Sequence, residues 1–320
     1  MKIITSGHFF LHSVSIYFNN QFSAVLSKFN EEKQNPDFSF KILIITSKYL
    51  LLLYLNDFTI IVANIYINMK VTIITAVLNC VGYIEDCMIS VQSQGYKNLE
   101  HIIIDGGSVD GTLDVIEKHK DFTTFLLSEA DFGIYDALNK GIAIARGDIL
   151  GILSADDRLA GNDVLSAIVD RIKSGDCDAV YGHLDFVPRD GRGIIRRKWK
   201  SRPYFRSCLE NGWMPPHPTF YVKKSALDGD TFYALNYGTC GDYDFILNLL
   251  YRKQIKAVCI DKIMVHMRKG GMSNGPLLNV FMSWVYDYRI LANHEVPAPL
   301  CAVLQKKIRK LRQFRISPGF

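Results

Sequence analysis

Cysteine motifs and targeting signals are scarce in this chain of 320 residues. The seven cysteines form no Cys-x-x-Cys pair and have no regular spacing. This usage is typical of free thiols and predicts a reducing, cytoplasmic compartment. The N-terminus also lacks a basic start, a compact apolar core and a small-residue cleavage site in that order, which argues against a signal peptide.

A glycine fingerprint is missing after the first strand of the core, beginning at Val71. That strand continues into Ala76-Val-Leu-Asn-Cys, and the turn Gly106–Gly111 has Ser108 where a second glycine would be needed. This excludes a dinucleotide-dependent oxidoreductase. A sugar nucleotidyltransferase would need a glycine-rich loop with Arg and Lys near the start of the domain. None follows Val71, so that class is a less favoured alternative.

Residues 1–68 show neither clean helical nor clean alternating periodicity. The apolar stretch 42–67 is interrupted by Lys48 and Asp57. Each would cost about 2.5–3.5 kcal/mol at a bilayer centre, which disfavours a membrane span. Met69-Lys70 leads directly into a strand. We therefore hypothesise that Met69 is the true start and that residues 1–68 are an extension with little stable structure, outside the catalytic fold.

The formal net charge of +5 is modest, but basic residues crowd into 189–202 and 305–315. Such patches suggest an anionic partner, for example a phosphate or a membrane surface. The first run surrounds Trp199 and is most often a solvated hairpin, with nucleic acid or membrane binding as the alternative. In the second region, Leu300, Leu304, Ile308 and Leu311 recur at helical spacing among Lys and Arg, typical of a helix lying on an anionic inner membrane.

From Val71 onward, apolar strands alternate with amphipathic helices, which predicts an α/β fold with a mostly parallel sheet. We expect one catalytic domain over 69–275 and a helical, basic segment over 276–320. Asp110 is expected to cap a helix, Gly147 to follow a helix in the C′ position, and Asp190-Gly191 to form a hairpin. The predicted strands cover 71–77, 99–105, 124–127, 148–154, 178–187, 218–222 and 256–266, and the predicted helices 83–94, 111–119, 134–146, 161–174, 242–252, 276–293 and 298–313.

Three carboxylates fall at or just after predicted strand ends, where open α/β sheets bind their ligands. Asp105 closes one strand and could accept hydrogen bonds from a base or ribose; a turn-forming Asp is the alternative. Asp156 and Asp157 follow another. Adjacent carboxylates repel unless a cation or hydrogen-bond donors compensate, and hard cations such as Mg²⁺ and Mn²⁺ prefer oxygen ligands. The alternative is a cap for the helix predicted at 161–174.

Four motifs follow one another over nearly 90 residues. They are Val71-Thr-Ile-Ile-Thr-Ala-Val-Leu-Asn, Ile103-Ile-Asp-Gly-Gly-Ser-Val-Asp-Gly-Thr, Ser128-Glu-Ala-Asp-Phe-Gly-Ile-Tyr-Asp-Ala-Leu-Asn-Lys-Gly and Ala145-Arg-Gly-Asp-Ile-Leu-Gly-Ile-Leu-Ser-Ala-Asp-Asp. Together they resemble glycosyltransferase family two, and most of all its branch that builds bacterial O-antigen, capsule and colanic-acid polysaccharides. The resemblance is strong over 69 to about 160, fair to 275, and absent in 1–68. It implies the GT-A fold, a Rossmann-like nucleotide-diphospho-sugar transferase, here with C-terminal helices.

The resemblance assigns roles to particular positions. Asp105 matches the residue that reads the base, usually uracil. Asp156 matches the ribose- or metal-contacting member of the acidic motif, and Asp157 matches its ligand for Mn²⁺ or Mg²⁺. The remaining donor-binding positions are Thr75, Ala76 and Asn79 near the nucleotide and Asp136 and Lys140 in the donor pocket.

The second half carries the expected base. Asp242 aligns with the family's catalytic Asp, and Asp244 is the second candidate; a helix cap is the alternative for Asp242. Gly241 stands where the family usually has an acidic partner, which leaves the register open. His217, in a Pro-flanked loop, matches a position near the acceptor or is a structural histidine.

Beyond the base, Arg268-Lys-Gly-Gly would approach the departing diphosphate, and His266 is a third candidate metal ligand. The resemblance therefore predicts an inverting glycosyltransferase with a nucleotide-sugar donor, a UDP-sugar in the first place. The acceptor would be a saccharide or a polyprenyl-diphosphate-linked saccharide. We expect a cytoplasmic protein with peripheral contact to the inner face of the membrane and no nucleic-acid partner. The alternative is a catalytically inactive GT-A-like binding protein.

Overall fold

The chain divides into two compact units, Met1–Asn68 and Met69–Phe320, in the computed structural model of the protein. The predicted hairpin at Asp190-Gly191 lies outside the described residues, and the predicted boundary at 275/276 stays a prediction. The structure describes residues 41–45, 50–54, 59–63, 69–189, 197–227, 229, 232–268 and 277–312.

The first unit contains a three-stranded antiparallel sheet in the order β1-β2-β3. Its strands are β1 (Lys41–Ile45), β2 (Leu50–Tyr54) and β3 (Thr59–Ala63). The β-branched residues of β1 and β3 favour an extended backbone. That residues 1–68 are an extension with little stable structure, outside the catalytic fold, stays a prediction.

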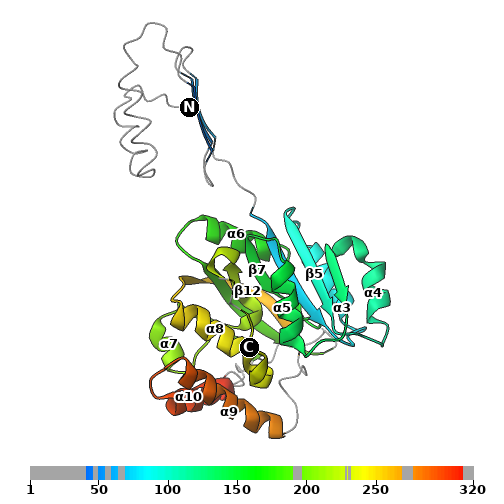
Figure 1. The fold of residues 1–320 in the computed structure, drawn as a ribbon, viewed down its shortest axis with the longest axis vertical. Helices are drawn as coiled ribbons and strands as arrows, with labels where there is room; N and C mark the ends of the chain where they lie inside the picture. The colour runs from blue at the N-terminus through cyan, green and yellow to red at the C-terminus, as the bar shows by residue number, and fades with distance from the viewer. Residues whose placement is uncertain are drawn as a thin grey trace, which may run out of the picture. The chain divides into compact units, whose positions relative to one another are not determined.

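The second unit is built on a nine-stranded sheet in the order β6-β5-β4-β7-β11-β9-β12-β8, with β10 paired to β9 (Figure 1). Parallel pairs join β4 to β5 and β7, β5 to β6, and β9 to β12. Because β11 is antiparallel to both β7 and β9, those two strands run the same way, and the sheet is mostly parallel as predicted. The strands are β4 (Val71–Val77), β5 (Leu99–Asp105), β6 (Phe125–Ser128), β7 (Ile149–Ile152), β8 (Arg158–Leu159), β9 (Ala179–Val187), β10 (Arg197–Trp199), β11 (Tyr221–Lys223) and β12 (Ala257–Arg268).

Helices cover both faces of this sheet. The predicted helix at 242–252 consists of α8 followed by a π-helical turn, Asn248–Arg252, and 3-10 turns occur at Lys120–Phe122, His217–Thr219, Lys224–Ala226 and Leu235–Cys240. The α-helices of the described residues are α3 (Ile84–Gln92), α4 (Thr112–Lys118), α5 (Ile134–Ile144), α6 (Val164–Lys173), α7 (Arg206–Glu210), α8 (Gly241–Leu247), α9 (Leu277–Asn293) and α10 (Pro299–Arg312).

Alternation along the central strands divides the core into two layers. Ile102 and Ile104 pack in one cluster with residues of α5 and α8, whereas Ile103 packs in the other with residues of α3 and α6. The parallel strands β4, β5 and β6 therefore end at one edge of the sheet, between two helical layers. The register places Val77 beside Asp105 and Asp105 beside Ser128 at that edge.

Two expected glycine and capping roles are wrong in detail. Helix α5 ends at Ile144, and its C-cap Ala145 has an extended ψ of 134°, so Gly147 is not in the C′ position. Gly147 is needed for close approach instead, because a Cβ there would lie 2.7 Å from the backbone nitrogen of Thr72. The N-cap of α4 is Gly111, with φ +96°, and not Asp110. Asp110 lies one residue before the cap, and its carboxylate accepts from the N–H of Thr112 at 3.0 Å.

The C-terminal helices α9 and α10 are docked on the catalytic fold rather than lying apart from it (Figure 1). Ala302 and Val303 are buried, and Asp287 of α9, itself buried, pairs with Lys306 at 2.6 Å and Lys307 at 2.9 Å. Two of the cations expected on the helix surface are therefore turned inward. None of the helices in the described part of the chain has the length and apolar character to cross a bilayer.

Gly151 of β7 gives a test of this packing. A Cβ there would lie 2.1 Å from the buried ring of Tyr221. Gly151→Ala should lower the free energy of unfolding by about 1–3 kcal/mol, the usual cost of overpacking a core. Urea unfolding measures this. Gly82→Ala is the matched control, because no atom lies within 4 Å of its Cβ position, and a comparable loss in both variants would contradict the packing argument.

Candidate active site

Asp105 ends β5 and folds back onto the turn that follows. Its buried carboxylate accepts from the N–H groups of Gly107 at 3.1 Å and Ser108 at 3.0 Å. The hydroxyls of Ser108 and Ser128 donate to it at 2.5 and 2.7 Å. This is the turn-forming arrangement that the sequence left open, and a contact to a nucleotide base stays a prediction.

Asn79 joins the loops that follow β4 and β5. It has φ +48°, a left-handed conformation that Asn tolerates better than most residues. Its backbone N–H donates to Ser108 Oγ at 2.8 Å, and its Oδ1 accepts from the N–H of Val109 at 2.9 Å. The two loops therefore form one wall at the carboxyl edge, with half-buried Ala76 just before it.

The side chain of Thr75 points away from that wall, and its expected contact with the nucleotide stays a prediction. It is fully buried, and its hydroxyl lies 3.0 Å from His101 Nε2 and 3.9 Å from Cys87 Sγ. Successive side chains of a strand point to opposite faces, so Thr75 faces α3 while Ala76 faces the other layer. Its hydroxyl therefore contacts the side chains between the sheet and α3.

An acidic loop before α5 crosses the same wall and was not predicted as part of the site. The Glu129 N–H donates to the Asp105 carbonyl at 3.0 Å, and Asp131 Oδ2 is 2.6 Å from the Cβ position of Gly106. Lys140 pairs with Glu129 at 2.7 Å and with Asp136 at 3.3 Å. The expected donor-pocket residues Asp136 and Lys140 are thus held beside the Asp105 turn, and the clue in the sequence was the density of acids in 129–136.

Asp156 and Asp157 lie in the turn between β7 and β8. Asp163 occupies the N-cap position of α6, so the capping alternative for the pair is wrong. Asp157 is fully buried; its Oδ1 accepts from the Arg268 N–H at 3.0 Å, and its Oδ2 has no hydrogen-bond partner in the described part of the chain. Burial, reinforced by the charge of Asp156, holds the pKa of the Asp157 carboxyl well above its usual range.

Arg268, at the end of β12, is buried against this turn. Its Nη1 donates to the Asp156 carbonyl oxygen at 2.8 Å, and its Nη2 pairs with the Asp86 carboxylate of α3. The guanidinium also lies 5.0 Å from the centre of the Tyr83 ring. The side chain therefore ties β12 and α3 to the acidic turn, and its predicted contact with a diphosphate stays a prediction.

His266 lies two residues before Arg268, opposite Arg158 of β8 and Asp185 of β9 in the sheet. Burial, together with the charge of Arg158, lowers its pKa. The described residues contain no group of three His, Cys, Asp or Glu side chains that could hold a metal ion. A cage that includes both Asp157 and His266 is therefore not formed by these residues alone. The orphaned Oδ2 of Asp157 still fits a single carboxylate contact to a cation.

Asp242 lies in the first turn of α8, where Cys240 rather than Asp242 is in the capping position. Its charge raises the pKa of two buried phenols, Tyr135 and Tyr233, after the larger effect of burial. Tyr233 OH lies 2.7 Å from His217 Nε2, and the same tyrosine stacks on Tyr135 with ring centres 5.5 Å apart. Burial lowers the pKa of His217, although the charge of Asp242 acts in the opposite direction. The lowered pKa keeps the imidazole neutral.

Two contacts distinguish the acidic residues of α8. Asp244 pairs with His294 of α9 at 2.9 Å, so its carboxylate is already used inside the fold. A Cβ at Gly241 would lie 2.9 Å from the Tyr135 ring and 3.0 Å from the Ala234 carbonyl oxygen. The missing acidic partner before Asp242 therefore has a packing reason.

The predicted residues form three groups, and Thr75 and His266 belong to none of them. The first group is Ala76, Asn79, Asp105, Asp136 and Lys140; the second is Asp156, Asp157 and Arg268; the third is His217 and Asp242. The first and second groups meet near Cys80, whose pKa is raised to about 11 by burial and by the charges of Asp156 and Asp110. The third group adjoins the first through α5, which carries Tyr135 next to Asp136.

The fold is also found in solved glycosyltransferase structures. Staphylococcus aureus TarS in complex with UDP-GlcNAc superposes with a TM-score of 0.57 at 19% identity, over 75% of this chain and 70% of that chain. A longer TarS chain is covered to 39%. Mannosyltransferase PcManGT from Pyrobaculum calidifontis, in complex with GDP-Man and Mn²⁺, superposes with a TM-score of 0.54 at 18% identity, over 93% of this chain and 80% of that chain. These likenesses show the GT-A fold.

Sequence comparison gives the family. The family described as Glycosyl transferase family 2 matches residues 72–228. An uncharacterised glycosyltransferase of Mycobacterium tuberculosis is 31% identical over 180 residues, which cover 55% of this chain and 67% of that protein. With its acidic turn at the carboxyl edge of a GT-A sheet, this chain belongs to glycosyl transferase family 2 and is a glycosyltransferase.

Proposed function

We propose that this glycosyltransferase moves a sugar from a nucleoside-diphosphate sugar to a saccharide or a polyprenyl-diphosphate-linked saccharide in bacterial surface polysaccharide synthesis. The observation that carries the donor class is the buried carboxylate of Asp157 at the carboxyl edge of the sheet, with half-buried Asp156 beside it. TarS and PcManGT have been solved with donors of this class. A UDP-sugar is the first candidate, because Asp105 matches the residue that usually reads uracil.

A divalent cation, Mn²⁺ or Mg²⁺, is expected at Asp157. Its Oδ2 is buried and unpartnered in the described part of the chain, and PcManGT was solved with Mn²⁺. Such an ion, when bound, neutralises negative charge on the leaving diphosphate. Arg268 contributes by holding Asp157 through its N–H and the turn through its guanidinium, so the carboxylate keeps one orientation.

Asp242 is our proposed general base. Direct displacement requires a group that takes the proton of the acceptor hydroxyl as this oxygen attacks the anomeric carbon, and the configuration inverts. Asp242 is half-buried at the start of α8, whereas Asp244 is engaged with His294. His217 is neutral and contacts Tyr233, so its ring can form a hydrogen bond with the acceptor saccharide as donor or as acceptor of the proton.

The base assignment is tested by Asp242→Asn. We expect turnover to fall by about 10²–10⁴-fold, because a positioned base typically contributes that much. Donor affinity should stay within about twofold, since Asp242 does not contact the donor in this proposal. Transfer assays with Mn²⁺ and a panel of UDP-, GDP- and TDP-sugars measure turnover, and calorimetry measures binding.

Asp244→Asn is the control for the base. Its turnover should stay near that of the wild type, while the loss of its His294 contact lowers thermal stability. Wild-type turnover in Asp242→Asn would refute the base assignment. Absence of nucleotide release from every donor, even with the wild type, would favour a catalytically inactive binding protein instead.

Asp157→Asn separates metal binding from folding. The pKa of the Asp157 carboxyl is higher in the folded protein than in the unfolded protein. The free energy of unfolding therefore falls as the pH rises above the pKa of the unfolded state, so the charged carboxylate is destabilising at neutral pH. The amide should therefore raise the free energy of unfolding of the ligand-free protein by about 1 kcal/mol. It should also abolish the extra thermal stability that Mn²⁺ and a nucleoside diphosphate confer together.

Exposed Asp121 provides the matched control for that experiment. Asp121→Asn should leave both the unfolding free energy and the ligand-induced stabilisation as in the wild type. If Asp157→Asn is less stable than the wild type and keeps the Mn²⁺-dependent stabilisation, Asp157 is not the metal ligand.

We further propose that the helix pair α9–α10 contacts the inner face of the cytoplasmic membrane. Helix α10 exposes Leu300, Leu304 and Ile308, and their exposed fractions are 62%, 45% and 49%. Helix α9 adds exposed Phe281, Trp284 and Tyr288 at helical spacing. The Lys307 ammonium lies 5.6 Å from the centre of the Trp284 ring, so the two rows meet on one side of the pair. Apolar rows beside cations suit an anionic bilayer.

Leu304→Glu tests the membrane contact. The charge should weaken binding to vesicles that contain phosphatidylglycerol by about tenfold or more, because a buried Leu contributes about 1.5–3 kcal/mol and the carboxylate is repelled. Co-sedimentation measures the binding. Ile89→Glu is the control: this residue is 45% exposed on α3, on another side of the sheet from α10 (Figure 1). Equal effects of both substitutions would contradict the proposed surface.

A further inference from the structure

Arg189, two residues beyond the end of β9, reaches across the site to the start of α3. Its Nε donates to the hydroxyl of Tyr83 at 2.7 Å, a contact between residues 106 positions apart. The guanidinium carbon also lies 5.2 Å from the centre of the Tyr83 ring, within the range of a cation–π interaction. An exposed arginine of the second half is thus held at a defined place beside the first.

Tyr83 lies within reach of two guanidinium groups with different surroundings. Arg268 is 5.0 Å from its ring centre and is buried, with its nitrogens donating to Asp156 and Asp86. Arg189 is exposed. Arg268 therefore holds the acidic turn from the buried side of Tyr83, and Arg189 lies on the solvent side of the same tyrosine.

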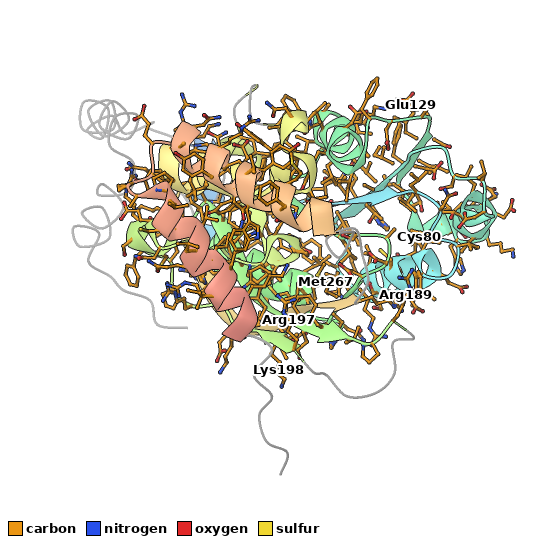
Figure 2. All side chains as sticks on the ribbon, turned by 90° about the horizontal axis from the view of Figure 1, so that it is seen from below. Cys80, Glu129, Arg189, Arg197, Lys198 and Met267 are labelled. Carbon is orange, nitrogen blue, oxygen red and sulfur yellow. The ribbon has the colours of Figure 1, made fainter. Side chains whose placement is uncertain are left out.

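The charge of Arg189 acts on the carboxyl edge of the sheet. The hydrogen bond that Arg189 donates to Tyr83 raises the pKa of Arg189, and the negative charge of Asp156 raises it further. The charges of Asp156, Asp110, Arg268 and Arg189 all act on the Cys80 thiol. Figure 2 shows Arg189 and Cys80 on the same side of the molecule, with Met267, the neighbour of Arg268, near them.

We propose that Arg189 binds the leaving diphosphate of the donor and that Tyr83 is the residue that positions it. This inference rests on the proposed nucleoside-diphosphate-sugar donor. In that reaction the bond between the anomeric carbon and the diphosphate oxygen breaks, and the electron pair leaves on the oxygen. The acceptor oxygen bonds to the anomeric carbon, and its proton passes to Asp242.

Negative charge therefore grows on the diphosphate as the bond breaks. A guanidinium matches phosphate oxygens with two parallel N–H groups, which an ammonium does not. Arg268 is buried whereas Arg189 is exposed, so Arg189 is the cation of this pair that lies on the solvent side. Holding its Nε on Tyr83 reduces the side-chain entropy that binding would otherwise cost.

The test compares two nucleotides in the presence of Mn²⁺. Calorimetry gives the dissociation constants of the nucleoside diphosphate that the wild type binds and of the matching monophosphate. Arg189→Gln should weaken binding of the diphosphate by about tenfold or more and that of the monophosphate by less than about twofold, since charge-assisted bonds to one phosphate are lost. Arg189→Lys should restore part of the diphosphate affinity, because it supplies charge without the fork.

Tyr83→Phe tests the positioning role. It removes the hydroxyl that accepts from Arg189 and keeps the ring. We expect a loss of about two- to tenfold for the diphosphate only, and no further loss when this substitution is added to Arg189→Gln. Lys198→Gln is the matched control, because Lys198 is an exposed cation of the neighbouring strand β10. It should leave both affinities unchanged.

Each outcome is decisive. Equal losses for the two nucleotides in Arg189→Gln, or no loss for either, would overturn the contact with the diphosphate. Additive losses from Tyr83→Phe and Arg189→Gln would overturn the positioning role of Tyr83 alone. If the wild type binds no nucleoside diphosphate, the proposed function fails and this inference fails with it. Thermal unfolding of each variant verifies that it is folded.

Discussion

The buried charge of Asp157 is the constraint on which the arrangement of the site depends. A carboxylate without solvent costs several kcal/mol unless hydrogen-bond donors or a cation compensate. Here one oxygen accepts from a single backbone N–H, that of Arg268, and the other has no partner in the described part of the chain. Such under-compensation favours the protonated form in the ligand-free protein. It also favours any ligand that brings positive charge to that oxygen, so stability and binding are opposed at this residue.

That hydrogen bond also connects two parts of the sheet that are far apart in the sequence. Asp157 follows β7, at the parallel β4–β5–β6–β7 half, whereas Arg268 ends β12 in the other half, 111 positions away. The Arg268 guanidinium extends the connection to the Asp156 carbonyl and to Asp86 on α3. Helix α5 makes a second connection through Tyr135, whose hydroxyl donates to the Thr239 carbonyl at 3.0 Å. The acidic turn and the segment just before Asp242 are therefore each held by contacts between distant parts of the chain.

The sequence predicts the parts of the site that depend on local pattern. The strand ends at Asp105 and the Asp156-Asp157 turn follow from apolar runs that stop at acids, and the structure places both as expected. Contacts between distant segments were not accessible in this way. Thr75 matches a family motif, but its hydroxyl is buried and contacts His101 of the next strand, which the motif does not predict. Lys306 fits an exposed helix face by spacing, but buried Asp287 draws it inward.

Gly241 illustrates how packing changes the meaning of a departure from a family pattern. In the sequence, the loss of an acidic residue beside Asp242 weakens the case for catalysis. In the structure, the position has no room for any side chain, because Tyr135 and the Ala234 carbonyl oxygen occupy that space. Tyr135 stacks on Tyr233, which in turn contacts His217. Gly241 therefore allows the stacked rings of Tyr135 and Tyr233 to pack against the start of α8. The departure exchanges a charge for a rigid surface beside Asp242, and a rigid surface is compatible with an acceptor site.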